Sequence, residues 1–283
     1  MKTHLNKGLI GDLSFIIPSI CGVSIFVLIP FVDVLRRSFM NVGGNRFVLF
    51  DNYIAIFQNA AFQLAFKNTV KFMAICIPIL ILFSLTVAVF LNSGYKIAGY
   101  LKTAYLVPMA IPVASVVLIW RIFFHESGYF SGLLNQLGMQ GQDWMNTKSA
   151  FWVLVFSYVW KNLGYNIVLW MAGLTSIPDT LYEAARADGA GPFACFRYIT
   201  MPQLMTTLYT VTVLAFLNSF KVFREAYLVA GDYPDESMYL LQHLFNNWFR
   251  DLSLDKMSAA AVVIIGMILV LISILQRIWA KED

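Results

Sequence analysis

Long apolar runs separated by short polar stretches dominate the hydrophobic pattern of this chain. A helix that crosses a bilayer needs about 20 mostly apolar residues, and the runs that reach this length lie at residues 13–35, 70–91, 103–124, 151–175, 204–230 and 259–278. Each run is continuously apolar and does not alternate with polar positions, which excludes transmembrane strands. We therefore predict an all-α integral membrane protein, a six-transmembrane-helix bundle that forms a single domain over residues 1–283.

The composition supports this class. Of the 283 residues, 59% are hydrophobic and 13% are charged, whereas soluble domains contain about 25% charged residues. The net charge of +4 is mild and no basic run is long enough to indicate a nucleic-acid partner. The cysteines, Cys21, Cys76 and Cys195, have no spacing that indicates disulfides or a zinc site.

The sequence lacks the motifs of the common enzyme classes. No G-x-x-x-x-G-K-[ST] phosphate loop occurs, so this chain does not hydrolyse ATP by that route. The histidines, His4, His125 and His243, lie far apart and form no metal-binding pattern. We expect neither an enzyme activity nor a cofactor or metal on this chain.

A polar segment at 176–203 separates two apolar runs and has the pattern of two short helices. Pro178 and Asp179 stand where a helix would begin, and Gly189 and Gly191 supply a stop and a turn. Pro192 suits the first position of a second helix. This composition does not suit the bilayer, so we expect the segment to lie at the membrane surface and to be held there by a partner.

The same segment resembles the EAA loop of ABC-importer permeases, in the carbohydrate-uptake branch of maltose and glycerol-phosphate type. We call residues 176–203 the EAA-like segment. The resemblance rests on Ile177, Pro178, Tyr182, Glu183, Ala184, Ala185, Asp188, Gly189, Ala190, Phe196, Ile199 and Pro202.

This resemblance implies that the segment docks on a separate ATPase. Glu183 would pair with a basic residue of that ATPase, and the small Ala184 and Ala185 would let the helix seat closely in a groove. Asp188 would cap the bend or make a polar contact, and Gly189 would permit the sharp turn. The implied docking residues are Tyr182, Glu183, Ala184, Ala185, Asp188, Gly189, Ala190 and Pro202.

The resemblance also implies an assembly that works by alternating access. The partners would be a second permease in a heterodimer, two ABC ATPase subunits that carry ATP and Mg, a solute-binding protein outside the membrane, and the lipid bilayer. Lysine and arginine counts on the two sides come out nearly equal, so the positive-inside rule does not decide the orientation. The resemblance places the EAA-like segment and both termini on the cytoplasmic side of a bacterial or archaeal inner membrane.

A few polar residues interrupt the fourth and fifth apolar runs. Such groups are costly in lipid and normally face protein or water, and amides and hydroxyl-bearing rings suit the hydroxyls and C–H faces of a sugar. Asn162 and Asn166 share a helix face, and the spacing of Lys221 and Glu225 permits an ion pair. The same residues could instead hold helices together. The predicted substrate path is Trp160, Lys161, Asn162, Tyr165, Asn166, Asn218, Lys221 and Glu225.

Several alternatives stay open at this point. An ion-driven secondary transporter or channel would place carboxylates at mid-membrane, where Glu225 is the candidate. A scaffold subunit without transport would not need the EAA-like segment. Within the ABC class the solute could be a sugar, a glycerol-phosphate or a polyamine-like compound. Pro78, Pro108 and Pro112 in the apolar runs could kink their helices as hinges or could simply shape the bundle.

Overall fold

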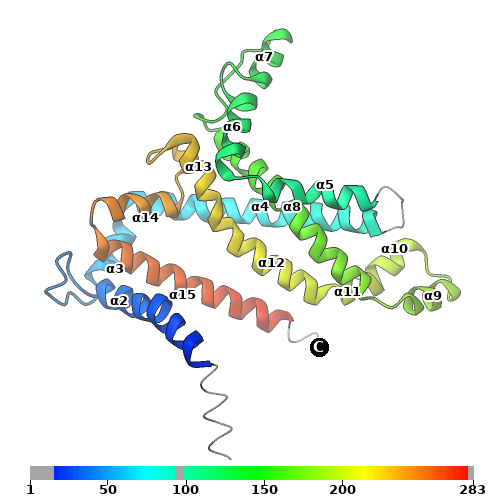
Figure 1. Ribbon diagram of the computed structural model, residues 1–283, viewed down its shortest axis with the longest axis horizontal. Helices are drawn as coiled ribbons and strands as arrows, with labels where there is room; N and C mark the ends of the chain where they lie inside the picture. Colours follow the sequence, from blue (N-terminus) through cyan, green and yellow to red (C-terminus); the bar gives the residue numbers. More distant parts are fainter. Residues whose placement is uncertain (1–15, 93–97, 280–283) are drawn as a thin grey trace, which may run out of the picture. The chain divides into compact units, whose positions relative to one another are not determined.

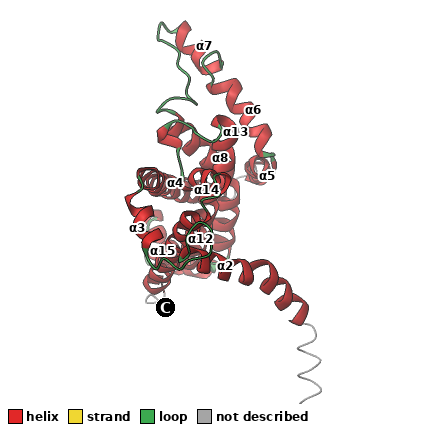
Figure 2. Ribbon diagram, turned by 90° about the vertical axis from the view of Figure 1, so that its left-hand side faces the viewer, coloured by secondary structure: helices red, strands yellow, loops and turns green. Residues whose placement is uncertain are grey.

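The computed structural model describes residues 16–92 and 98–279, and their regular secondary structure is helical, with no strand among them (Figure 2). An isolated bridge joins Met40 to Phe47. The α-helices are α2 (Ile29–Ser38), α3 (Asp51–Gln58), α4 (Ala60–Asn92), α5 (Ala98–Ala110), α6 (Val113–Phe124), α7 (Tyr129–Gln136), α8 (Ala150–Thr175), α9 (Asp179–Ala187), α10 (Pro192–Cys195), α11 (Met201–Gln203), α12 (Met205–Ser219), α13 (Phe223–Ala230), α14 (Leu241–Arg250) and α15 (Leu254–Trp279). The π-helical turns are η1 (Ser24–Leu28) and η2 (Phe196–Thr200), and the 3₁₀ turns are η3 (Phe220–Val222) and η4 (Glu236–Met238).

Four helices in the described part of the chain are long and apolar enough to cross a membrane. They are Ile16–Ser38, Ala60–Asn92, Met205–Ala230 and Leu254–Arg277. The second of these begins ten residues before its apolar run, because buried Phe62, Ala65 and Thr69 continue one face of the helix at a spacing of three to four residues. The fold class is therefore all-helical with long apolar helices.

The third apolar run is broken. Thr103–Ala110 and Val113–Gln136 are together long and apolar enough to cross a membrane, but the two segments meet at an angle of 101°. The break falls at Ile111 and Pro112, and Pro112 has the extended dihedrals φ −57° and ψ 142°. Proline has no N–H to donate and disfavours helical geometry in the residue before it, which explains the break. Pro78, by contrast, lies inside the continuous helix α4.

The described residues pack as two compact units. The first contains residues up to Ala60 together with Asn247–Val270, and the second contains Ala61–Asn246 with the residues from Leu271 onward. In the first unit, the side-chain amide of Asn52 joins α3 to the end of α2. It donates to the carbonyl of Ser38 at 2.9 Å and to that of Met40 at 2.7 Å.

The core of the second unit lies where α4, α8 and α12 pack together (Figure 1). Phe72 of α4 meets the ring of Tyr158 edge-on at 5.5 Å, and the indole of Trp170 donates to the Ser84 hydroxyl at 3.0 Å. The Tyr158 hydroxyl in turn donates to the carbonyl of Ala215 on α12 at 2.5 Å. Side-chain packing and interhelical hydrogen bonds of this kind hold membrane helices together, because lipid tails leave little hydrophobic driving force between them.

Glycines let the neighbours of α8 approach closely. A Cβ atom at Gly164 would overlap the carbonyl of Tyr105, so α5 lies directly against the α8 backbone at this point. On the α12 side, a Cβ atom at Gly173 would collide with the Thr207 hydroxyl and would lie 2.9 Å from Leu204. Small residues at such contacts are typical of membrane helix pairs.

His243 at the start of α14 is buried and neutral. Its Nδ1 accepts the Leu240 N–H at 3.2 Å, and its ring packs edge-on against Phe223 at 4.8 Å. Burial lowers the pKa of His243 from 6.5 to about 4, although the nearby Asp232 acts in the opposite direction. The hydrogen bond that Nδ1 accepts requires the neutral ring, so protonation would break it.

Candidate functional site

The first half of the EAA-like segment forms the helix α9. Pro178 precedes it in the extended conformation, and Asp179 lies in the first turn, where a negative charge favours the helix dipole. At the other end Gly189 adopts a φ of +84°, a left-handed conformation that glycine adopts without steric cost. The Ala190 N–H bonds the Ala185 carbonyl at 2.9 Å and the Gly189 N–H bonds the Arg186 carbonyl at 3.0 Å, which is the Schellman pattern. The predicted stop at Gly189 is therefore confirmed as local structure.

The second half returns through three short helical pieces. Pro192 opens α10 at its first position, as predicted from the sequence. The chain continues through η2 into α11, where Pro202 has no N–H to donate. The turn before Pro202 is π-helical, and the Met201 N–H bonds the carbonyl of Phe196. The segment therefore passes into α12 along a nearly continuous helical path.

The predicted docking residues fall into two groups by exposure. Glu183, Ala184, Asp188, Gly189 and Pro202 are exposed. Tyr182, Ala185 and Ala190 are half-buried. The acidic and small residues of α9 are thus open to a partner, while the half-buried residues face the protein.

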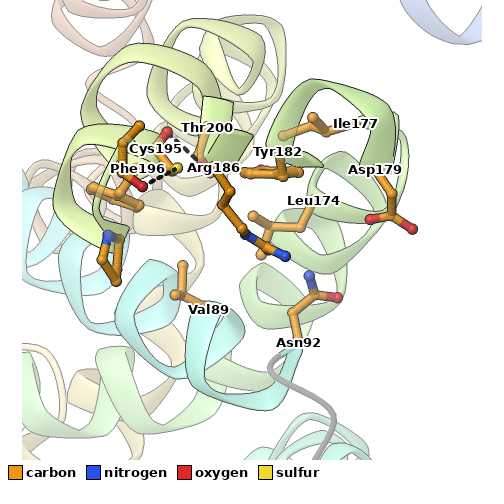
Figure 3. Close-up of a pocket in the computed structure, with 12 residues that line it drawn as sticks. Val89, Asn92, Leu174, Ile177, Asp179, Tyr182, Arg186, Cys195, Phe196 and Thr200 are labelled. Carbon is orange, nitrogen blue, oxygen red and sulfur yellow. Dashed lines mark hydrogen bonds between the residues drawn. The ribbon is translucent and has the colours of Figure 1, made fainter. Parts of the chain in front are cut away.

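A pocket of about 540 Å³ lies beneath α9, and we call it the loop pocket. In Figure 3 the α9 residues and those of the returning chain lie on facing sides of it. The hydroxyls of Tyr182 and Thr200 meet across it at 2.9 Å, and the Thr200 hydroxyl also contacts the carbonyl of Cys195 at 3.5 Å. These contacts tie α9 to the chain that leads into α12. The lining residues are Val89, Asn92, Leu174, Ile177, Asp179, Tyr182, Arg186, Ala190, Pro192, Cys195, Phe196 and Thr200.

A second pocket, of about 460 Å³, lies within the helices, and we call it the bundle pocket. One wall is the break between α5 and α6, and the others come from α8 and from the α12–α13 region. The predicted path residues Lys161, Asn162, Asn218, Lys221 and Glu225 all line it. The full lining is 109–113, Tyr158, Lys161, Asn162, Asn218, Lys221, Val222, Arg224 and Glu225.

The ion pair at this pocket differs from the one that the helical spacing permitted. Lys161 Nζ lies 2.9 Å from Glu225 Oε1, and both side chains are largely buried, at 18% and 8% exposed. Lys221 instead donates to the Asn218 side-chain oxygen at 2.7 Å. The pairing of Lys221 with Glu225 is therefore wrong. A lysine from another helix reaches the buried carboxylate, while Lys221 is exposed.

The other predicted path residues lie on α8 outside the bundle pocket. Trp160 is half-buried and packs edge-on against Trp120, with ring centroids 5.2 Å apart. Asn166 is buried and donates to the main-chain carbonyl of Asn162 at 2.8 Å. Tyr165 is half-buried. Trp160 thus makes a contact between helices, as the alternative of helix association required, whereas the amide of Asn166 bonds within α8 itself.

Several pocket residues were not in the predicted site. Arg224 lines the bundle pocket beside Lys221. Tyr158 and residues 109–113, where the helix is interrupted between α5 and α6, also contribute to its walls. Pro112 was the available signal for the break, but no local pattern indicated which helices it would face. Within the described residues no group of three or more His, Cys, Asp and Glu could hold a metal ion.

The sequence matches a known family over most of its length. Residues 52–281 match the model of the binding-protein-dependent transport system inner membrane component. The chain is 30% identical over 255 residues to the trehalose/maltose transport system permease protein MalF of Thermococcus litoralis, covering 88% of this chain and 86% of that protein. It is also 30% identical over 266 residues to the sn-glycerol-3-phosphate transport system permease protein UgpA of Salmonella choleraesuis, covering 90% and 88% of the two chains.

The fold is shared with a solved structure. A chain in the crystal structure of a bacterial ABC transporter involved in the import of the acidic polysaccharide alginate aligns with a TM-score of 0.85. It has 20% sequence identity, and the alignment covers 98% of this chain and 99% of that one. The family decides against the ion-driven carrier or channel, since its members are transport subunits whose ATP is hydrolysed by separate ATPases. The chain therefore belongs to the binding-protein-dependent transport system inner membrane components, the multi-pass permease subunits of ABC importers.

Proposed function

We propose that this chain is one of two permeases in an importer of a sugar or oligosaccharide. The relatives named for trehalose and maltose, and for glycerol phosphate, support a polyhydroxylated solute. The observation that carries the proposal is the bundle pocket, which gathers amide, hydroxyl and charged side chains among apolar helices. Such groups match the hydroxyls of a sugar, and buried polar residues in a membrane bundle mark solute paths.

The proposed path crosses the membrane within six spans. The four helices that are long and apolar enough supply four spans, and the bent pair of Thr103–Ala110 and Val113–Gln136 supplies another. The remaining one is α8, whose 26 residues extend about 39 Å at a rise of 1.5 Å each, enough for a bilayer core of about 30 Å. An even number of spans places both termini on one side, and we assign that side to the cytoplasm.

The EAA-like segment is the proposed docking site for the ATPase. Its helix α9 offers the exposed carboxylate of Glu183 next to the small exposed side chain of Ala184. A basic residue of the ATPase would pair with Glu183 while α9 lies in a groove. Closure of the ATPase dimer would then move α9 and, through the Tyr182–Thr200 contact, the start of α12.

The proposed assembly contains this chain, a second permease, two ATPase subunits with ATP and Mg, and a solute-binding protein. Transport follows alternating access, with the bundle pocket open first to the binding protein and then to the cytoplasm. An alginate transporter of the same fold has been solved in complex with a periplasmic protein bound to an alginate pentasaccharide. That arrangement supports the binding protein as a partner here.

Reconstitution of the complete importer tests the proposal. A ligand screen by thermal shift on the cognate binding protein first identifies a solute. Proteoliposomes that contain both permeases and the ATPases should then take up that solute only when ATP and the binding protein are supplied. Uptake driven by an ion gradient without ATP, or purification of the chain without any ATPase, would contradict the proposal.

A further inference from the structure

The bundle pocket is lined by more basic than acidic side chains. Lys161, Lys221 and Arg224 line it together with one acid, Glu225. Glu225 is 6% exposed, and the ammonium group of Lys161 lies 2.9 Å from its carboxylate. This pair is neutral as a unit, so Glu225 is already compensated by a residue from α8.

Lys221 and Arg224 keep their positive charge without an acidic neighbour. Lys221 donates to the neutral side-chain amide of Asn218. In the described part of the chain, neither Lys221 nor Arg224 has a carboxylate within ion-pair distance. Both side chains are exposed and line the same pocket, three positions apart in sequence.

Two uncompensated cations among apolar helices create a strong local field. The low-dielectric walls of the pocket focus this field, so an anion is attracted more strongly there than at an open surface. Arg224 can bind a carboxylate or phosphate with two parallel hydrogen bonds, and Lys221 can add a third charge-assisted bond. The same field repels a cationic solute, which argues against a polyamine.

From this geometry we infer that the solute bears an anionic group, a carboxylate or a phosphate, in addition to hydroxyls. Lys221 and Arg224 bind the anionic group, and the side-chain amides of Asn162 and Asn218 line the same pocket within reach of the hydroxyls. This inference rests on the proposed function, since it names the class of solute that passes through the bundle pocket. The same two cations could also bind the phosphate of a lipid headgroup, and the experiment separates these sources.

The test measures binding to the complete importer in nanodiscs of neutral lipid. The probes are glucuronate and sn-glycerol 3-phosphate, each compared with its neutral counterpart, glucose or glycerol. We expect each anionic probe to bind about tenfold more tightly than its counterpart, a difference of about 1.4 kcal/mol. High salt should reduce the preference, because it screens the two exposed cations.

Three variants test whether Lys221 and Arg224 cause the preference for the anionic probes. The double variant Lys221→Gln and Arg224→Gln should lose it, while Lys221→Arg with Arg224→Lys keeps both charges and should retain it. Lys148→Gln removes an exposed cation outside the pocket and serves as the matched control. Thermal unfolding of each variant checks that folding is intact.

Clear outcomes would overturn the inference. These are equal binding of the neutral and anionic probes, no binding of either probe, and a preference for the anionic probes that persists in the double Gln variant. A second set of nanodiscs contains phosphatidylglycerol, and a loss of bound phosphatidylglycerol in that variant without any change in solute preference would assign the two cations to lipid instead. Failure of the importer to couple ATP to uptake, with anion binding intact, would count against the proposed function and leave the inference standing.

Discussion

Lys161 on α8 and Glu225 on α13 form a 2.9 Å ion pair across 64 positions of sequence. The pair fixes the α12–α13 region to α8 at the bundle pocket. Both charged side chains are largely buried, so each charge is stabilised mainly by the other.

Removal of one partner of this ion pair should therefore destabilise the protein much more than removal of both. Lys161→Met leaves a buried carboxylate uncompensated and should lower the free energy of unfolding by about 3 kcal/mol. The double variant Lys161→Met and Glu225→Leu should recover most of that loss. Thermal unfolding in detergent measures both effects, and strictly additive losses would show that the two charges are not coupled.

Gly164 should not tolerate even a methyl group. Gly164→Ala places a Cβ against the main-chain carbonyl of Tyr105, which cannot rotate away, so α5 has to move. We expect a loss of about 2 kcal/mol in the free energy of unfolding, the range of overpacking in a close contact. Gly132→Ala on α7 meets nothing within 4 Å and is the matched control. It should be neutral or slightly stabilising, and equal losses at the two glycines would contradict the close approach of α5 and α8.

Charge reversal at Glu183 should uncouple transport without unfolding the protein. The side chain is exposed on α9, so Glu183→Lys should leave membrane insertion and thermal stability unchanged. The lysine would repel the basic residue proposed on the ATPase, and solute-stimulated ATP hydrolysis and uptake should both fall. Glu126→Lys, at another exposed glutamate outside the EAA-like segment, controls for the change in net charge. Wild-type uptake in Glu183→Lys would remove this residue from the docking site.

His243 should make the protein less stable in mild acid. Its pKa is about 4 in the folded state and 6.5 in the unfolded state, so between these values the unfolded chain binds the extra proton. The contribution of His243 to stability is complete above pH 6.5 and is lost as the pH falls toward 4. The loss amounts to roughly 3 kcal/mol, at about 1.4 kcal/mol for each pKa unit.

A substitution that cannot titrate isolates this effect. His243→Asn keeps an acceptor near the position of Nδ1, which receives the Leu240 N–H. Unfolding midpoints of the wild type and the variant, compared from pH 7 to pH 4, should diverge as His243 becomes protonated in the unfolded chain. Parallel pH profiles for the two proteins would show that another group carries the acid sensitivity.

Local chemistry made the turn of the EAA-like segment predictable. The stop at Gly189 depends on a single residue that accepts a positive φ, and Pro192 fits the first turn of a helix because no N–H is needed there. Both properties belong to the residue and its close neighbours, so the sequence alone indicates them. The docking role of the exposed residues stays a prediction, because it depends on a partner chain.

The bundle pocket was predictable only in part. Polar residues inside apolar runs marked Asn162, Asn218 and Glu225 as candidates, because such groups avoid lipid. The pairing of Glu225 with Lys221 was wrong because helical spacing reveals only neighbours on the same helix, whereas Lys161 lies on another helix. The wall formed by the break at Pro112 was likewise missed as part of the site, since its position depends on how distant helices pack.

The helical path that leaves the EAA-like segment has a mechanical consequence. From Pro192 the main chain runs through α10, η2, α11, α12 and η3 to the end of α13, and Leu204 is its one non-helical residue. This helical path covers residues 192–230 and changes direction at α11, on either side of which α10 and α12 run at an angle to each other (Figure 1). A movement of the chain at Pro192 would be carried toward Asn218, Lys221 and Arg224 by the backbone hydrogen bonds of these helices. The proposed solute contacts in the bundle pocket and the proposed docking helix α9 are therefore joined by one stretch of mostly helical main chain.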